Sequence, residues 1–315
     1  MAFFRRVVVG VEMPKTRPWK AADLSNPCRL AVEQAFIAAN SARISVTLAC
    51  VLPRADGGWF GSPEEADRML AADNSSALAV LKELHQQHGN PSAAAASEMV
   101  VVHGDAWEEL IRVAGNRPDC LIVCGTRDHG TIRRVLFGST GLKLLRLAPG
   151  TVWILKPKTE DNDSVDIVAA TDGGPVGADV LLTAVPLAKS LNGRLHVVHA
   201  VDPASKNPDA LKQAEAIVHQ QLAATDYRTL PFGVKVSVTQ GDADQCILKA
   251  VEDSSADVLV IGTSSKTGVS GLLPGTTVER LLPELSCSVM ALKPEGFRSM
   301  LPADFWTLQR SQQLH

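Results

Sequence analysis

The sequence predicts an α/β protein of two tandem domains, each a parallel sheet with helices on both faces. Short β-branched runs alternate with helical patterns along the whole chain, which is typical of βαβ units. A block of strand, Gly-rich loop, helix and strand occurs twice, at residues 119–157 and 256–294. Three markers (Gly-Asp, Gly-Thr and Lys-Pro) each recur 137 residues apart. One offset shared by three markers indicates a tandem duplication.

The first half opens with an apolar run at residues 5–11, as expected of a central parallel strand. Residues 53–63, with several glycines around Trp59, predict a loop, and Asp105 has the position of a helix cap. A docked surface loop is favoured for this segment over a flap or a subunit contact. In chain order we expect strands over 5–11, 43–52, 98–102, 121–124 and 151–155, and helices over 28–40, 64–88, 105–114 and from 139 onward.

The pattern restarts after a charged linker at residues 158–164. We expect strands over 166–170, 194–200, 235–238, 258–261 and up to Lys293-Pro294, and helices over 176–191, 208–224, 242–252 and from 275–277. The domains are therefore 1–158 and 164–294, followed by a tail, 295–315. The apolar part of this tail either docks on the body or binds a partner, and the sequence leaves both open. The first strands lie 160 residues apart, so we expect the extra residues of the first half in its second-strand loop and long helix.

The composition predicts a cytoplasmic protein. Apolar residues make up 45% and charged residues 21% of the chain, with a net charge of −3. No basic field indicates nucleic acid or an anionic membrane as a partner. The apolar run near the N-terminus is too short for a signal peptide core or a membrane span. Six scattered cysteines indicate reduced thiols rather than a disulfide framework.

A loop of small residues that leads into a helix start is suited to holding an anion. Its backbone N–H groups are unpaired, and the helix dipole adds partial positive charge. Both repeated blocks resemble the universal stress protein family, whose signature is Gly-x2-Gly-x9-Gly-(Ser/Thr) after the fourth strand. The resemblance covers residues 3–294, as the tandem two-domain type. It implies an open five-stranded parallel sheet in each half, of order 3-2-1-4-5, with ATP, AMP or ADP bound at the carboxyl ends of the strands.

The resemblance implies a nearly complete nucleotide site in the second half, with Mg²⁺ as an accompanying ion. Asp172 has the position of an acid that faces the nucleotide, and Val201 that of a backbone contact to adenine. The second Gly of the signature is Ser265, which can donate a hydrogen bond but restricts the backbone. The implied nucleotide-binding residues are Ala170, Asp172, Val201, Gly262, Ser265, Lys266, Gly268, Gly275, Thr276 and Thr277.

The first half departs further from the signature, and we expect a degenerate nucleotide loop there. Its acid is Glu12, and the second Gly is Asp128. A carboxylate about 4 Å from a phosphate charge costs about 1 kcal/mol in water and about 4 kcal/mol at a protein surface. Nearby cationic residues could offset this repulsion (Arg127, His129, Arg133 and Arg134). Nucleotide is therefore expected chiefly in the second half.

Other candidate sites are weaker. Cys120 and Cys124 share one face of a strand, where two buried thiols are favoured over a metal or redox pair. His196 and His199 point to opposite faces, so we expect structural roles for both. A helix cap beside a solvated His103 is favoured over a general base. No nucleophile elbow, phosphate-binding Walker loop or metal-spaced His/Glu pattern occurs.

Three functions remain open at this point. The first is a stress-response or protective module that binds ATP without dedicated turnover. The second is a nucleotide-independent scaffold, favoured by the loss of the same Gly at Ser265 and Asp128. The third is slow ATP hydrolysis with Asp172 as the base. The resemblance also implies that the two halves pair within one chain, across residues 152–155 and 289–292, as a pseudo-dimer. Dimerisation of the whole chain is left open.

Overall fold

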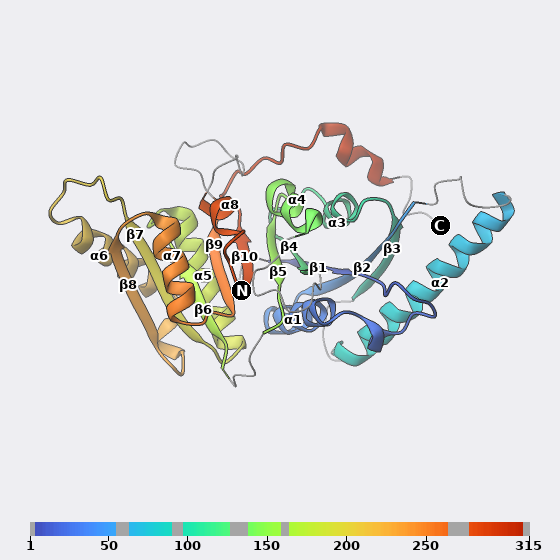
Figure 1. Cartoon of the computed structure of the whole chain (residues 1–315), viewed down its shortest axis with the longest axis horizontal. Helices are drawn as coiled ribbons and strands as arrows, with labels where there is room; N and C mark the ends of the chain where they lie inside the picture. Colours follow the sequence, from blue (N-terminus) through green and yellow to red (C-terminus); the bar gives the residue numbers. More distant parts are fainter. Residues whose placement is uncertain are drawn as a thin grey trace.

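The computed structural model describes residues 4–54, 63–89, 97–126, 138–158, 164–263 and 277–310. Two α/β halves lie side by side and share one sheet (Figure 1). The strand order is β3-β2-β1-β4-β5 in the first half and β10-β9-β6-β7-β8 in the second. Each half therefore has the predicted order 3-2-1-4-5, and its strands are parallel. The predicted fold class is confirmed.

The strands agree with the predicted ones to within two residues at most ends. Those of the first half are β1 (Arg6–Val11), β2 (Ser45–Leu52), β3 (Glu98–His103), β4 (Cys120–Gly125) and β5 (Thr151–Leu155). Those of the second half are β6 (Asp166–Ala170), β7 (Arg194–Val201), β8 (Val234–Gln240), β9 (Val258–Gly262) and β10 (Ser288–Leu292). The inner strands are apolar throughout because helices cover both of their faces.

The helices bury two separate apolar cores against the two faces of the sheet. One face is covered by α1 (Asn26–Ala42), α2 (Pro63–His88), α5 (Pro175–Ser190) and α6 (Ala210–Ala223). The other is covered by α3 (Ala106–Ala114), α4 (Ser139–Leu147), α7 (Ala243–Asp253) and α8 (Thr277–Leu281). Three short 3-10 helices are η1 (Ala21–Asp23), η2 (Tyr227–Thr229) and η3 (Ala303–Arg310). Asp105 and Asp242 precede α3 and α7 as predicted, but neither side chain makes a capping hydrogen bond.

The two halves join through an antiparallel pair of strands, β5 and β10. Trp153 lies opposite Met290 in this pair, and both side chains are fully buried. The predicted pseudo-dimer within one chain is therefore confirmed. The two Lys-Pro markers reinforce it, because each lysine reaches across the seam. Lys156 Nζ donates to the carbonyl of Ser286 at 2.8 Å, and Lys293 Nζ donates to the carbonyl of Leu145.

The extra residues of the first half are only partly where the sequence predicted them. Residues 12–25 connect β1 to α1, whereas only residues 171–174 connect β6 to α5. Helix α2 has 26 residues and its counterpart α6 has 14. The prediction for the long helix is confirmed, but the one for the second-strand loop is wrong. Most of the remaining excess follows the first strand, because 149 residues already separate α1 from α5 (26 to 175).

The C-terminal tail docks on the first half (Figure 1). Ser299 Oγ donates to the carbonyl of Leu147, at the end of α4, at 2.6 Å. Phe305 is 7% exposed, and the guanidinium of Arg112 in α3 lies 4.5 Å from the centre of its ring. Docking on the body, one of the two alternatives for this tail, is what the structure shows for the residues up to 310.

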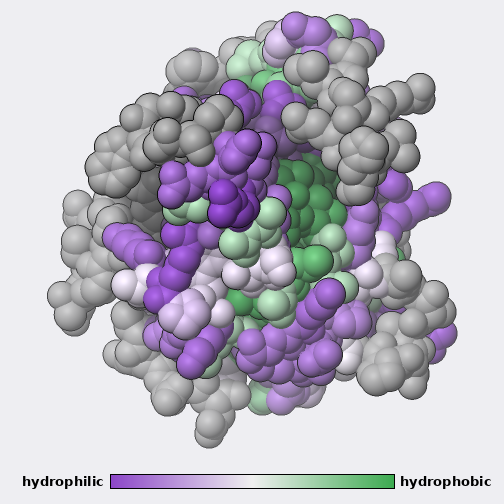
Figure 2. Space-filling model, turned by 90° about the vertical axis from the view of Figure 1, so that its right-hand side faces the viewer, coloured by the Kyte–Doolittle hydropathy of each residue, from purple (hydrophilic) through white to green (hydrophobic). Residues whose placement is uncertain are grey.

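Strands β3 and β8 form the two edges of the sheet. The residues of β3 after Glu98 are half-buried. Figure 2 faces this end of the molecule and shows apolar side chains gathered in a hollow between hydrophilic ones. An edge strand has main-chain groups without ladder partners, so it differs from the inner strands that position the site.

Candidate functional site

The structure brings the described members of the predicted site to one edge of the second half. Ala170 and Gly262 are the last residues of β6 and β9, which are neighbouring strands. Val201 ends β7, and Thr277 begins α8. The carboxyl ends of parallel strands meet at this edge, where doubly wound sheets bind ligands. The other predicted members lie outside the described residues (Ser265, Lys266, Gly268, Gly275 and Thr276).

Asp172 follows β6 and is fixed by the main chain around it. Its Oδ1 accepts hydrogen bonds from the N–H groups of Gly174 at 2.9 Å and Gly177 at 3.2 Å. These groups belong to the start of α5, so the carboxylate also meets the positive end of the helix dipole. Gly173 has φ +76°, a conformation that favours glycine, and it allows the chain to turn back toward the helix.

Two side chains beside Asp172 were not predicted as members of the site. Gln221 in α6 donates from Nε2 to the carbonyls of Gly173 at 2.8 Å and Gly174 at 3.1 Å. His199 in β7 lies 2.9 Å through Nδ1 from the carbonyl of Thr171, so that nitrogen carries the proton. A structural role was predicted for His199. Sequence gave no signal for Gln221, because a glutamine on a polar helix does not reveal what it reaches.

The first glycine of the signature is required by packing in both halves. A Cβ at Gly262 would lie 2.3 Å from Cγ1 of Val176, in the first turn of α5. A Cβ at the equivalent Gly125 would lie 2.5 Å from main-chain atoms of Pro27, in α1. Each strand therefore ends in close contact with the helix that follows the first strand of its half. This contact explains the glycine without any ligand.

A cavity of about 230 Å³ lies at the same edge of the first half. Its floor is formed by small residues of the strands, Gly10 in β1 and Ala49 in β2. Leu110 of α3 and Ile154 of β5 supply apolar walls, and Glu12 lies at the rim. The volume is a little below the range of about 300–1,000 Å³ that is usual for small-molecule sites. An apolar slot of this size can take a flat ring such as a nucleobase.

The start of α4 supplies the polar side of this cavity. Gly138 is the N-cap residue of the helix, and Thr140 and Gly141 in its first turn also line the cavity. The first N–H groups of a helix have no partner within it, and the dipole is positive there. A ligand with a flat apolar part and an anionic end would satisfy both sides. Helix α4 has nine residues, whereas α8 in the second half has five.

Two thiols line the cavity of the first half, and both are held in the protonated form. Burial raises the pKa of Cys28 to about 11 and that of Cys124 to about 12. The thiol of Cys28 also contacts the carbonyl of Glu12 at 3.9 Å. Because the thiolate is the nucleophile, these cysteines are inert at neutral pH. Cys120 is likewise buried, with a pKa raised to about 12, so the interpretation of Cys120 and Cys124 as core thiols is favoured over a redox pair.

Comparison with known proteins agrees with this arrangement. The model of the universal stress protein family matches residues 20–156 and 166–293. The chain belongs to the universal stress protein family. The match covers both halves, so this universal stress protein carries two family domains in tandem, and the resemblance found in its Gly-rich blocks is confirmed.

Relatives of the tandem type are similar over most of the chain. Universal stress protein E of Escherichia coli (strain K12) is 25% identical over 222 residues, which cover 65% of this chain and 70% of the relative. A crystal structure of a universal stress protein described as putative, from Pseudomonas aeruginosa UCBPP-PA14, aligns with a TM-score of 0.64 at 21% identity. That alignment covers 97% of this chain and 96% of the other. At this identity the likeness concerns the fold alone.

A further solved structure is a universal stress protein in complex with cAMP, which matches 41% of this chain at 18% identity. Its TM-score of 0.36 is too low to carry over a binding site. Within the described ranges, no group of three His, Cys, Asp or Glu side chains could hold a metal ion. In the same part of the chain, no helix is both long and apolar enough to cross a membrane.

Proposed function

We propose that this universal stress protein is a cytoplasmic stress-response module that binds ATP, or a related adenine nucleotide, chiefly in its second half. The observation that carries the proposal is the position of Asp172, Val201 and Gly262 at the carboxyl edge of three neighbouring strands. The Gly-rich loop follows Gly262 directly. Anionic ligands of doubly wound sheets bind at this edge, where a loop empties onto a helix start.

Charge supports the preference for the second half. Its loop has Ser265 where the first half has Asp128, so no carboxylate opposes the phosphates at that position. The serine hydroxyl can donate to a phosphate oxygen. Lys266, the next residue, adds a cation. Mg²⁺ would arrive with the triphosphate, which supplies oxygen ligands to the ion.

The cavity beside Gly10 and Gly138 supports a second, weaker nucleotide site in the first half. Its apolar floor suits a base, and the start of α4 suits a phosphate. Asp128 would weaken that site by charge repulsion. We therefore propose two sites of unequal affinity rather than one active and one empty half.

Binding without dedicated turnover is favoured over the two alternatives. As a base, Asp172 would be weak, because two N–H groups stabilise its carboxylate and hold it against α5. A nucleotide-independent scaffold is supported by the β5–β10 junction and by the docked tail. The scaffold does not account for the cavity, which packing alone leaves unfilled.

Calorimetric titration of the full chain with ATP, AMP and ADP, with and without Mg²⁺, tests the proposal. We expect heat of binding and a melting temperature that rises with nucleotide concentration, because a ligand that binds only the folded state stabilises it. A titration without heat, together with a melting temperature unchanged by millimolar ATP, would leave the scaffold as the better account. Phosphate release that falls in Asp172→Asn would instead support hydrolysis.

A further inference from the structure

A second cavity, of about 520 Å³, lies at the seam between the two halves, away from the edge where nucleotide is proposed to bind. Helix α1 of the first half and the start of β9 of the second contribute to it. It also contacts the junction strands, through Trp153 and Leu155 of β5 and Ser288 of β10. We call it the seam cavity. Its volume falls within the range of about 300–1,000 Å³ that is usual for small-molecule sites, which occur preferentially at domain interfaces.

Two buried polar atoms of residues that line the seam cavity have no hydrogen-bond partner. One is Nε1 of Trp153, a donor on a side chain that is only 1% exposed. The other is Oε1 of Gln34 in α1, an acceptor. Buried polar groups are nearly always paired, so an unmatched donor and an unmatched acceptor beside one cavity indicate a missing partner. That partner must offer one acceptor and one donor.

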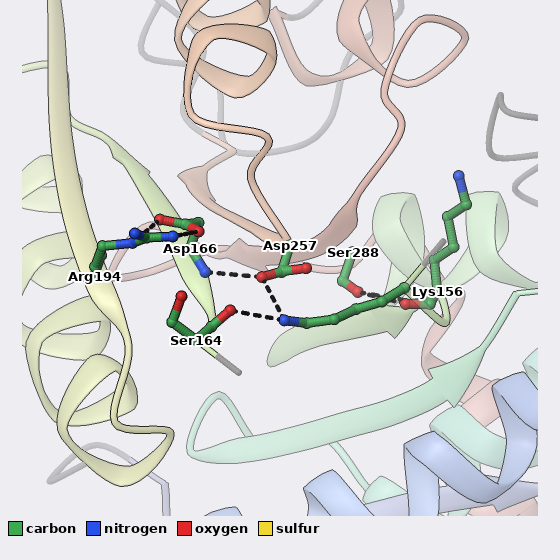
Figure 3. A network of polar contacts seen from close by, with 7 residues as sticks. Lys156, Ser164, Asp166, Arg194, Asp257 and Ser288 are labelled. Atoms are coloured by element: carbon green, nitrogen blue, oxygen red, sulfur yellow. Dashed lines mark hydrogen bonds and ion pairs between the residues drawn. The ribbon is translucent and has the colours of Figure 1, made fainter. Parts of the chain in front are cut away.

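The walls of the seam cavity are held in place by polar contacts across the junction (Figure 3). Asp257 accepts from the N–H of Asp166 at 2.8 Å and pairs with Nζ of Lys158 at 3.0 Å. Ser288 Oγ accepts from the N–H of Lys156 at 3.1 Å. These bonds connect the end of β5 to the starts of β6, β9 and β10. The cavity is therefore preformed, which lowers the cost of binding.

The charges around the seam cavity cancel. Lys156 and Lys158 are matched by Glu252 and Asp257, so no net field selects an anion or a cation. The remaining lining includes apolar side chains, among them Leu30, which suit an apolar body. A phosphate-bearing nucleotide fits this environment poorly. A neutral group with an acceptor and a donor side by side fits it well, and a carboxamide is such a group.

We propose that the seam cavity is a second ligand site, which takes a neutral small molecule bearing a carboxamide on an apolar body. The carbonyl oxygen accepts from the indole N–H of Trp153, and the amide N–H donates to Oε1 of Gln34. A ligand held in this way contacts both halves and closes their junction. The site is separate from the nucleotide edge, so its occupancy does not depend on nucleotide.

Benzamide is the probe that tests this proposal, and the indole N–H resonances of the full-length ¹⁵N-labelled chain are the readout. The chain has five tryptophans, and the spectrum of Trp153→Phe identifies the resonance of Trp153. We expect benzamide to shift that resonance with a saturable dependence on concentration. Acetophenone, which lacks the donor, should bind roughly tenfold more weakly, and Gln34→Met should weaken benzamide to a similar extent because each removes one hydrogen bond to a buried group.

The proposal fails if the Trp153 resonance does not move up to the solubility limit of benzamide. It also fails if benzamide, acetophenone and benzoate bind equally, because the cavity would then select only apolar surface. A magnetisation transfer from water to the Trp153 indole that benzamide does not displace would show that ordered water is the partner. Competition by ATP would contradict the claim of a separate site.

Discussion

The two halves of the sheet differ most just after their first strands. In the second half, four residues (171–174) lead from β6 to α5, and Gln221 of α6 binds this short connection. In the first half, fourteen residues (12–25) make the same connection, and a cavity lies beside them. One fold therefore gives a tightly bound edge or an open one, depending on a single connection. The sequence signature alone ranks the halves by charge and does not reveal this difference.

The halves also fill their cores differently at equivalent positions 137 residues apart. In the first half Gly141 faces Ile154, and a Cβ there would lie 3.0 Å from Cδ1 of that side chain. In the second half these positions hold Val278 and Ala291, so the large and small residues are exchanged. Volume is conserved while its location changes, as close-packed cores require. The two cores are therefore not interchangeable, although the fold is.

The largest expected difference between the halves is their response to alkaline pH. Four buried thiols of the first half have pKa values raised by burial above the usual 9.0 (Cys28 to about 11, and Cys50, Cys120 and Cys124 to about 12). Above pH 9 the unfolded chain loses these protons and the folded chain keeps them. Each thiol should then reduce the free energy of unfolding by about 1.4 kcal/mol per pH unit.

Lys293, at the end of the second half, has the opposite sign. Burial lowers its pKa from 10.5 to about 7, so the unfolded state binds more protons between these values. Stability should therefore rise as pH increases from about 7, until the thiols reverse the trend above pH 9. Urea unfolding from pH 6 to pH 10 measures both slopes. Lys293→Met should flatten the rise, and Cys124→Ala should reduce the fall; slopes unchanged in both variants would contradict the assignment.

The next largest effect concerns the glycines that end β4 and β9. At Gly125 an added methyl group meets the backbone of Pro27, which cannot rotate away, whereas at Gly262 it meets the side chain of Val176. We expect Gly125→Ala to cost about 3 kcal/mol and Gly262→Ala about 1 kcal/mol, within the range known for overpacking. Chemical denaturation of the two variants compares them directly. Equal losses would show that the helix starts yield equally in both halves.

A smaller effect is expected from the tail, which ties the second half to the first. Phe305→Ala removes a buried ring and its contact with Arg112, and should cost about 2 kcal/mol. Because the ring lies on α3, hydrogen exchange should accelerate in α3 and not in α7. Met300→Ala is the matched control, since that side chain is 60% exposed. Faster exchange in both helices would mean that the tail stabilises the whole chain.

The sequence was sufficient for the fold because the duplication repeats every element. It also predicted the junction, since the last strand of each half is apolar throughout. It misplaced the insertion after β1, because residues 12–25 contain no helical or strand period that reveals their length as a connection. The cavity of the first half depends on how Gly10 and Ala49 meet helices distant in the chain, which no local pattern encodes. Gln221 and the docking of Phe305 are tertiary contacts of the same kind.

The central claim is that nucleotide binds chiefly in the second half, and one matched pair of variants tests it most directly. Gly138 and Gly275 are equivalent, 137 residues apart, and Gly138 has φ −55°, which an aspartate adopts without strain. In calorimetric titrations with ATP, Gly275→Asp should weaken the tighter site about tenfold or more by charge repulsion, and Gly138→Asp should leave it unchanged. A loss confined to Gly138→Asp would move the main site to the first half and contradict the account.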